Sequence, residues 1–147
     1  MSKINFLSKY AVQTRHYDLD HEITKALDDP NWSSRIAAIR HPNATKENID
    51  KALNDSDWSV RVYAIQHPNA TKEHIDKALG DPNPNVRGAA IQQPNATKEQ
   101  LDKALKDRNA DVRHSAIRNP NVTKEHIDKT LNDSSWYVRE TAKERSK

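Results

Sequence analysis

Residues 41–66 read HPNATKENIDKALNDSDWSVRVYAIQ, and the chain repeats this pattern every 26 residues. The next copies are HPNATKEHIDKALGDPNPNVRGAAIQ at 67–92 and QPNATKEQLDKALKDRNADVRHSAIR at 93–118, and a further copy opens at 119 with NPNVTKEHIDKTLNDSSWYVRE. They are preceded at 21–40 by HEITKALDDPNWSSRIAAIR, the same unit with a divergent beginning. A period of this size predicts a stacked array, because one such unit cannot bury its apolar face alone.

Each unit carries the signals of two short helices, here called helix A and helix B. Thr45 is a good N-cap for a helix A over about 46–54, because its hydroxyl can accept a bond from a free N–H of the first turn. The apolar residues of this helix follow at helical spacing, at Ile49, Ala52 and Leu53. Helix B is expected over about 58–66, ended by the next proline, with an apolar stripe at Val60, Ala64 and Ile65.

Neither helix reaches the length of about 12 residues that an isolated helix needs in water, so packing between units must hold them. On the outer face of helix A, Glu47 and Lys51 are four residues apart and can pair.

We therefore predict an all-α protein, a right-handed α-solenoid of about five helix-pair repeats in one domain over 1–147. The expected parts are an N-terminal cap at 1–17, with a divergent helix B over Asn5–Gln13, and repeats at 18–40, 41–66, 67–92, 93–118 and 119–147. The last repeat is expected to be a polar C-terminal cap, because Lys143 takes the place that isoleucine holds at positions 39, 65, 91 and 117.

The composition narrows the class of protein. Only 34% of the residues are hydrophobic, which is low for a globule with one central core and suits a one-dimensional stack. The chain has no cysteine, which excludes disulfides, thiolate metal sites and iron–sulfur clusters. It shows neither a signal peptide nor an apolar run of about 18 residues, so we expect a cytoplasmic protein without membrane contact. The Asn-Ala-Thr and Asn-Val-Thr sequons are accordingly interpreted as turn and cap residues.

The segment Leu53-Asn54-Asp55, followed by Val60-Arg61 and Ala64, resembles the second half of a HEAT repeat. That family places Asp in the turn, a Val-Arg pair five and six residues later, and a small residue three further on. The Pro-Asn-x-Thr opening and the short unit also resemble the variant leucine-rich repeats of bacterial proteins, in which one of the two helices can be 3₁₀. The resemblance covers about residues 19–143 and implies an α-solenoid, although Ser34 stands in place of the Val.

The resemblance also implies a role for two positions that hold the same residue in every repeat. We call the set of residues at one repeat position a column, and these two invariant columns hold arginine and aspartate. In HEAT-like proteins the Arg bonds the turn Asp of its own or the adjacent repeat. We therefore expect a structural arginine–aspartate ladder made of Arg35, Arg61, Arg87, Arg113 and Arg139 with Asp29, Asp55, Asp81, Asp107 and Asp133. The alternative is that the five arginines contact a ligand directly, as a row of phosphate-binding groups.

Columns that vary between repeats are free to serve a partner, and they lie on helix B. In HEAT-like superhelices the B helices line the concave side, so the resemblance places the binding face there. The candidate partner-binding residues are Arg40, Tyr63, Gln66, Gln92, His114 and Arg118. The variation in these columns could instead be neutral sequence change on a surface that binds no partner. The uniform helix A columns, in which Lys and acids alternate, are interpreted as a solvated convex face.

Tryptophan begins helix B in three repeats, at Trp32, Trp58 and Trp136. Such a residue can be an exposed anchor for a partner, since binding hot spots favour Trp. It can also plug the turn between the two helices, and we favour this packing role.

Metal binding and catalysis find no support in the sequence. His41 and His67 are one repeat apart, about 10 Å at the usual helix separation, which is too far to share an ion held at about 2 Å per ligand. We find no catalytic motif, and with two glycines there is no glycine-rich phosphate loop. We therefore expect no enzyme, no cofactor and no metal.

The expected function is that of a non-enzymatic binding module, a protein–protein interaction scaffold, adaptor or inhibitor that uses the concave helix B face. The favoured partner is another protein. The alternative is nucleic-acid backbone binding through Arg40, Arg118 and part of the arginine column.

Overall fold

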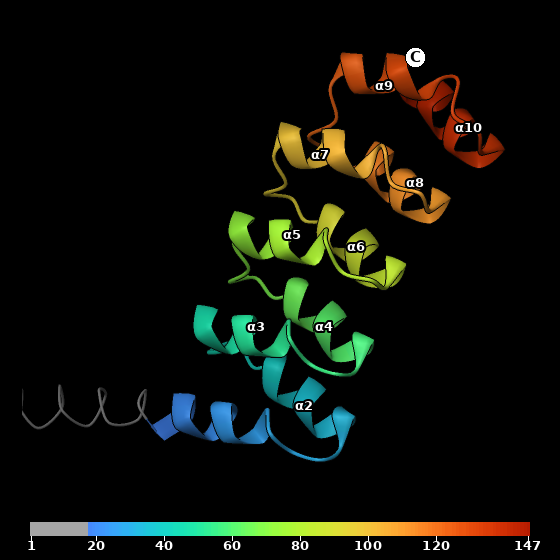
Figure 1. Ribbon diagram of the computed structural model, residues 1–147. Coiled ribbons are helices and arrows are strands. Elements are labelled where there is room, and N and C mark those ends of the chain that lie inside the picture. Colours follow the sequence, from blue (N-terminus) through green and yellow to red (C-terminus); the bar gives the residue numbers. More distant parts are fainter. Residues whose placement is uncertain (1–17) are drawn as a thin grey trace, which may run out of the picture.

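The computed structural model describes residues 18–147, and this part of the chain consists of helices and short turns without a strand (Figure 1). Residues 18–26 form the first helix described. It is followed by α2 (Trp32–Ile39), α3 (Lys46–Ala52), α4 (Trp58–Ile65), α5 (Lys72–Ala78), α6 (Pro84–Ile91), α7 (Lys98–Ala104), α8 (Ala110–Arg118), α9 (Lys124–Thr130) and α10 (Trp136–Arg145). The predicted cap at 1–17, with its helix over Asn5–Gln13, lies outside the described residues.

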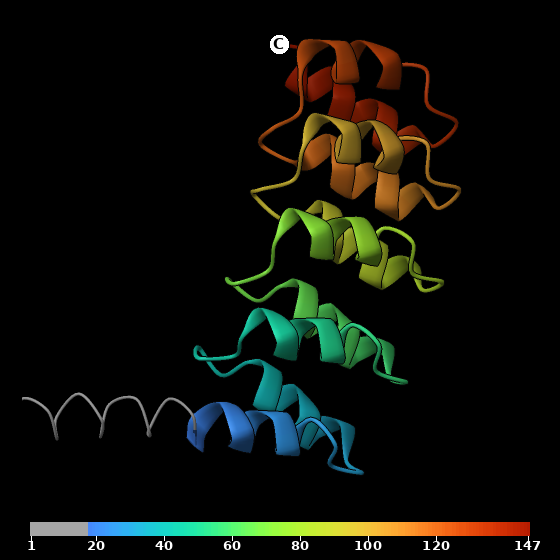
Figure 2. The same ribbon diagram turned by 60° about the vertical axis from the view of Figure 1, so that its left-hand side comes forward.

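The helices are arranged in successive pairs that stack along one direction (Figures 1 and 2). Helix 18–26 and α2 form the pair at the blue end, and α9 and α10 form the pair at the red end. The prediction of an all-α fold built from repeated helix pairs is confirmed. Both helices of each pair are α-helical, so the 3₁₀ helix of some variant repeats is not found in this range.

The start of each helix A from α3 to α9 is fixed by a threonine. In α3, Thr45 Oγ1 accepts the N–H of Asn48 at 3.2 Å, and Asn48 Oδ1 accepts the N–H of Thr45 at 2.9 Å. This reciprocal capping box recurs at Thr71, Thr97 and Thr123, and it satisfies two N–H groups that the helix itself leaves free. The predicted cap at Thr45 is confirmed, and the helix ends at Ala52, two residues earlier than predicted.

The start of helix B uses a second kind of cap. The side chains of Asn31, Asp57, Asn83 and Asn109 each accept the N–H of the residue two positions further on. Proline is tolerated at the first position of α6, at Pro84, because the N–H that it lacks would have no partner within the helix.

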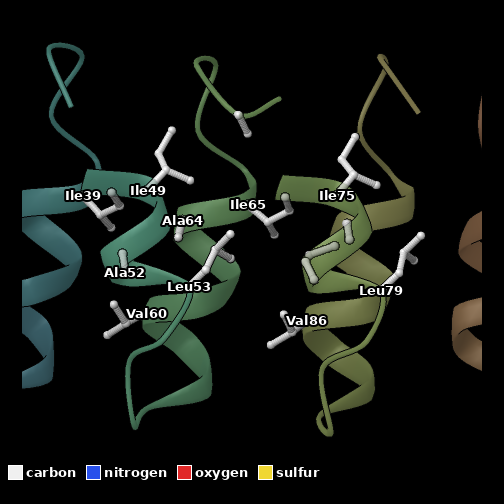
Figure 3. Packing of buried hydrophobic residues seen from close by; sticks show 14 of the residues in the cluster. Ile39, Ile49, Ala52, Leu53, Val60, Ala64, Ile65, Ile75, Leu79 and Val86 are labelled. Carbon is white, nitrogen blue, oxygen red and sulfur yellow. The ribbon is translucent and has the colours of Figure 1, made fainter. Parts of the chain in front are cut away.

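The core runs along the stack instead of gathering at one centre (Figure 3). In the second pair, Ile49, Ala52 and Leu53 of helix A meet Val60, Ala64 and Ile65 of helix B, and all six are buried, as the apolar spacing predicted. Figure 3 shows Ile75, Leu79 and Val86 in the same places one unit further on. Each unit therefore covers the apolar face of its neighbour.

The two rows of helices pack differently. Successive B helices, α2, α4, α6, α8 and α10, pack directly on one another, whereas the backbones of the successive A helices α3, α5, α7 and α9 lie farther apart. Each A helix instead packs on the B helix of its own unit and on that of the preceding unit.

The isoleucine column ends as the sequence predicts. Ile39, Ile65, Ile91 and Ile117 are fully buried, whereas Lys143 is exposed in α10. Among the helices of residues 18–147, none is long and apolar enough to cross a bilayer.

Glu47 and Lys51, which the spacing allows to pair, do not form an ion pair in the structure. Lys51 Nζ lies instead 2.7 Å from Asp28 Oδ2, a carboxylate of the preceding unit. In the last unit the equivalent i,i+4 pair does form, with Lys129 Nζ 2.6 Å from Glu125 Oε1. The place of Asp28 is taken there by a lysine, at position 106.

Candidate functional site

The arginines of the invariant column join consecutive units. Arg87 donates from Nε and Nη2 to the two carboxylate oxygens of Asp107, at 2.7 and 3.0 Å, and Nη1 donates to the carbonyl oxygens of Asp81 and Pro82. Each arginine therefore holds the turn of its own unit and the aspartate of the next. The same two-pronged ion pair joins Arg35 to Asp55, Arg61 to Asp81 and Arg113 to Asp133.

The charged side chains of these pairs are half-buried to buried, and within each pair the arginine and the aspartate neutralise each other's charge. The hydrogen bond to Asp107 raises the pKa of Arg87. Burial, the largest single effect on Asp107, raises the pKa of that carboxyl, but the bonds from Arg87 and the Asn109 N–H outweigh it, so the pKa is lowered. The bond from Arg113 likewise lowers the pKa of Asp133. Each of these four arginines could contact a phosphate only by leaving its aspartate.

The described part of the ladder begins at Asp29 and ends at Arg139. Asp29 accepts the N–H of Asn31 at 2.8 Å, as Asp55 accepts that of Asp57. Arg139 donates to the carbonyl oxygens of Asp133 and Ser134 at 2.6 and 3.2 Å, and among residues 18–147 no carboxylate pairs with it. Arg139 therefore has the bonds to its own turn without the bond to a next unit.

A second row of contacts, which sequence reasoning missed, joins the A helices. The third residue of each helix A is buried and reaches back to the preceding unit: His74 Nε2 lies 3.3 Å from Asp50 Oδ1, and His126 Nε2 lies 3.0 Å from Asp102 Oδ1. Gln100 Nε2 donates in the same way to Asp76 at 2.9 Å. The capping-box spacing is the signal that could have placed these residues inward. The uniform aspartates expected on a merely solvated face thus accept bonds between units.

The histidines at the start of the repeats are also part of the scaffold. His67 is buried, with Nε2 at 3.0 Å from the carbonyl oxygen of His41, while its Nδ1 accepts the N–H of Asn69. At the equivalent place Asn119 Nδ2 donates to the carbonyl oxygen of Ile91 at 2.6 Å. Nowhere in residues 18–147 do three His, Asp or Glu side chains gather to hold a metal ion.

The candidate binding residues lie along the outer side of the B helices. Arg40, Tyr63, Gln66, Gln92 and Arg118 are exposed, and His114 is half-buried. The structure brings them together in small groups rather than in one cluster. The Arg40 guanidinium lies over the Tyr63 ring, 5.5 Å from its centroid.

The second group lies towards the C-terminal end of the same face. Gln92 Nε2 donates to Ser115 Oγ at 3.1 Å. His114 Nε2 lies 3.1 Å from Thr141 Oγ1, and its ring meets Tyr137 edge-on at 5.3 Å. His114 is thus already engaged by the next unit, which fits its partial burial.

Three adjoining hollows run along this face and form what we call the B-face groove. The first, of about 480 Å³, is lined by Trp32, Ser33, Ile36, Trp58, Ser59, Val62, Tyr63 and Gln66. The second, of about 320 Å³, shares Trp58, Val62 and Gln66 with the first and extends to Gln92 and Ser115. The third, of about 330 Å³, shares Gln92 and Ser115 with the second and adds His114 and Arg118. The groove therefore changes from aromatic to polar along the stack.

The favoured packing role of the tryptophans is wrong. Trp32, Trp58 and Trp136 are 52%, 45% and 69% exposed. They stand at the first position of helix B, while the core beneath them is closed by residues such as Val60. A signal was present in the sequence, since the same position holds Pro84 and Ala110 in other repeats. A place that accepts Trp, Pro and Ala is not a closely packed one.

Comparison with known proteins adds no relationship: no protein-family model and no curated protein matches the sequence.

Proposed function

We propose that this protein is a non-enzymatic binding module, and that a partner protein lies along the B-face groove. The observation that carries the proposal is the exposure of Trp32, Trp58 and Tyr63 beside one hollow. Interface hot spots are enriched in Trp, Tyr and Arg. Large aromatic side chains facing water gain about 25 cal/mol for each Å² of apolar surface that a partner covers.

The packing of the two rows of helices supports this face. In a curved stack the row that packs more closely lies on the inside, and here that row is formed by the B helices. We infer a right-handed, HEAT-like α-solenoid with the groove on its concave side, acting in the cytoplasm as a scaffold, adaptor or inhibitor. A concave surface can surround a partner over several repeats.

The hydrogen bonds of the other polar side chains also support the B-face groove as the binding surface. The arginine–aspartate ladder, the third residues of the A helices and the opening histidines all bond within the stack. The groove residues Tyr63, Gln66 and Arg118 instead project from it.

The nucleic-acid alternative is weakened by the same bonds. Four of the five arginines of the invariant column, part of which it invokes, are paired with aspartates. Arg40 and Arg118 are three repeats apart, roughly 25–30 Å at 8–10 Å per helix. Two cations at that separation offer few phosphate contacts, and each contact contributes only about 0.9 to the slope of log affinity against log salt.

The test is capture of partners by the tagged full-length protein, followed by mass spectrometry. The variant carries Tyr63→Ala with Arg118→Ala, and the matched control carries Lys72→Gln with Lys98→Gln on exposed helix A positions. We expect the groove variant to lose a protein that the wild type and the control retain, with both variants melting close to the wild type. Equal capture by all three proteins would contradict the proposal.

A further inference from the structure

The aromatic hollow at the N-terminal end of the groove has a regular geometry. Trp32 and Trp58 occupy the same position of consecutive B helices and line the same hollow, beside Tyr63. Among residues 18–147 its remaining lining is neutral and contains no carboxylate. Because α2 and α4 pack directly on one another, the two indoles should repeat at the usual helix separation of about 8–10 Å.

That separation matches one polypeptide conformation. A polyproline II helix has three residues per turn and rises about 3.1 Å per residue, so residues i and i+3 lie on one side about 9.3 Å apart. In a β-strand, residues i and i+2 share a side at about 6.8 Å, while i and i+3 face opposite sides. An α-helix repeats every 5.4 Å. Only the polyproline II period places consecutive equivalent side chains against the two tryptophans.

The hydrogen-bonding groups of the hollow select the same ligand. Trp32, Trp58, Tyr63 and Gln66 line the hollow, where their indole N–H, hydroxyl and amide groups can bond a ligand. An indole N–H is only a donor. Proline residues present carbonyl acceptors without N–H donors, and a polyproline II backbone has no internal hydrogen bonds. The two indole N–H donors of the hollow therefore complement the carbonyl acceptors of a proline-rich backbone.

The charge of Arg40 indicates which kind of residue flanks the prolines of the ligand. Arg40 is exposed over the Tyr63 ring and forms no ion pair with a carboxylate among the described residues. A partner residue that reaches this guanidinium finds the strongest complement in an Asp or Glu side chain.

We propose that the hollow between Trp32 and Trp58 binds a proline-rich segment of the partner protein in the polyproline II conformation. Prolines three residues apart pack on the two indoles, and an acidic residue next to them pairs with Arg40. This inference rests on the proposed function, and it names the chemistry of the partner segment at one end of the groove.

The test uses the full chain, the synthetic octapeptide Pro-Ala-Ala-Pro-Ala-Ala-Pro-Glu, and NMR detection of the indole N–H signals. The chain contains three tryptophans, so each indole reports separately. We expect Trp32 and Trp58 to shift with peptide and Trp136 to stay in place. Trp58→Ala should weaken binding by about tenfold or more, as truncation of a hot-spot residue does, whereas Trp136→Ala should leave the affinity unchanged.

Two further peptides test the geometry and the charge. The rearranged peptide Pro-Pro-Pro-Ala-Ala-Ala-Ala-Glu has the same composition and no prolines three residues apart, so it should bind about tenfold more weakly. Replacing the glutamate with glutamine should weaken binding to the wild type and not to Arg40→Gln.

Three results would overturn the inference. The first is that the indole signals do not shift at about 1 mM peptide, a concentration that corresponds to a binding free energy of only about −4 kcal/mol. The second is that the rearranged peptide binds as tightly as the original. The third is that an oligothymidylate binds more tightly than the peptide and depends on Trp58, which would indicate base stacking instead. If partner capture still depends on Tyr63 and Arg118 in any of these cases, the proposed function stands and only the proline-rich ligand fails.

Discussion

Removing the guanidinium of Arg87 should cost more stability than removing the equivalent group of Arg139. Arg87 is 6% exposed and bonds both oxygens of Asp107 and two carbonyl oxygens. In Arg87→Ala the Asp107 carboxylate stays half-buried and retains only the Asn109 N–H, at 2.8 Å. Breaking a buried pair by removing one partner costs about 3–5 kcal/mol. We take about 3 kcal/mol here, because the Asp107 side chain keeps 12% of its surface in water.

Arg139 provides a matched control within the same chain. It bonds carbonyl oxygens of its own turn at 2.6 and 3.2 Å and no described carboxylate. Arg139→Ala should therefore cost about 1 kcal/mol, the usual value for lost hydrogen bonds. At roughly 2–4 °C per kcal/mol for a chain of this size, Arg87→Ala should melt about 6–12 °C below the wild type and Arg139→Ala about 2–4 °C below it.

Thermal melting followed by circular dichroism, with urea titration as a check, measures both losses. Arg87→Lys should fall between them, since one ammonium cannot reproduce the two-pronged bond. A melting temperature unchanged by Arg87→Ala, together with loss of partner binding, would refute the structural role and make the column a ligand site.

Three other predictions follow from the stack, its charges and its two faces. Leu79→Ala removes a buried side chain in mid-stack and should cost about 2–5 kcal/mol by urea titration, clearly more than Leu131→Ala, whose side chain is only half-buried; equal losses would indicate a single central core. The pKa of Asp107 is lower in the folded protein than in the unfolded chain, so its contribution to the free energy of unfolding is complete above the unfolded-chain pKa of about 3.9 and is lost as the pH falls through the lower folded-state pKa. The free energy of unfolding, measured against pH, should therefore fall on acidification, and it should fall less in Asp107→Asn. Partner affinity and melting should be unaffected by a triple Lys→Gln change at Lys46, Lys72 and Lys98 on helix A. A triple change at Tyr63, His114 and Arg118 on helix B should reduce affinity strongly and lower the melting temperature slightly, because His114 bonds Thr141 of the next unit. Loss of binding by the lysine variant, with binding retained by the helix B variant, would favour nucleic acid.

Those features that depend on neighbouring residues of the sequence could be predicted from it. The cap at Thr45 and the buried stripe of Ile49, Ala52 and Leu53 follow from spacing within one helix. The end of the isoleucine column at Lys143 follows from comparing units of the same chain.

Features that depend on how one unit sits on the next could not be predicted from the period alone. His74 and Asp50 are 24 residues apart, and a capping residue gives no indication of which group lies beyond it. The exposure of Trp58 depends on whether an adjacent helix covers the first turn of α4, and the repeat pattern does not fix that geometry. The six candidate residues lie on or at the ends of B helices in the structure, whereas the sequence interpretation assigned Trp32 and Trp58, which line the groove beside them, to packing.

The forward direction of the arginine–aspartate bonds has a genetic consequence. Each junction joins an arginine to the aspartate 20 residues ahead, so in-frame loss of residues 67–92 would leave Arg61 beside Asp107 in the geometry that it now has with Asp81. Unequal recombination between repeats of the coding sequence could therefore shorten or lengthen the protein by whole units, and at each new junction an arginine would still face an aspartate. Each such event would alter the reach of the molecule by about 8–10 Å, one helix separation, and a family of such chains could vary in length while sharing a single kind of junction.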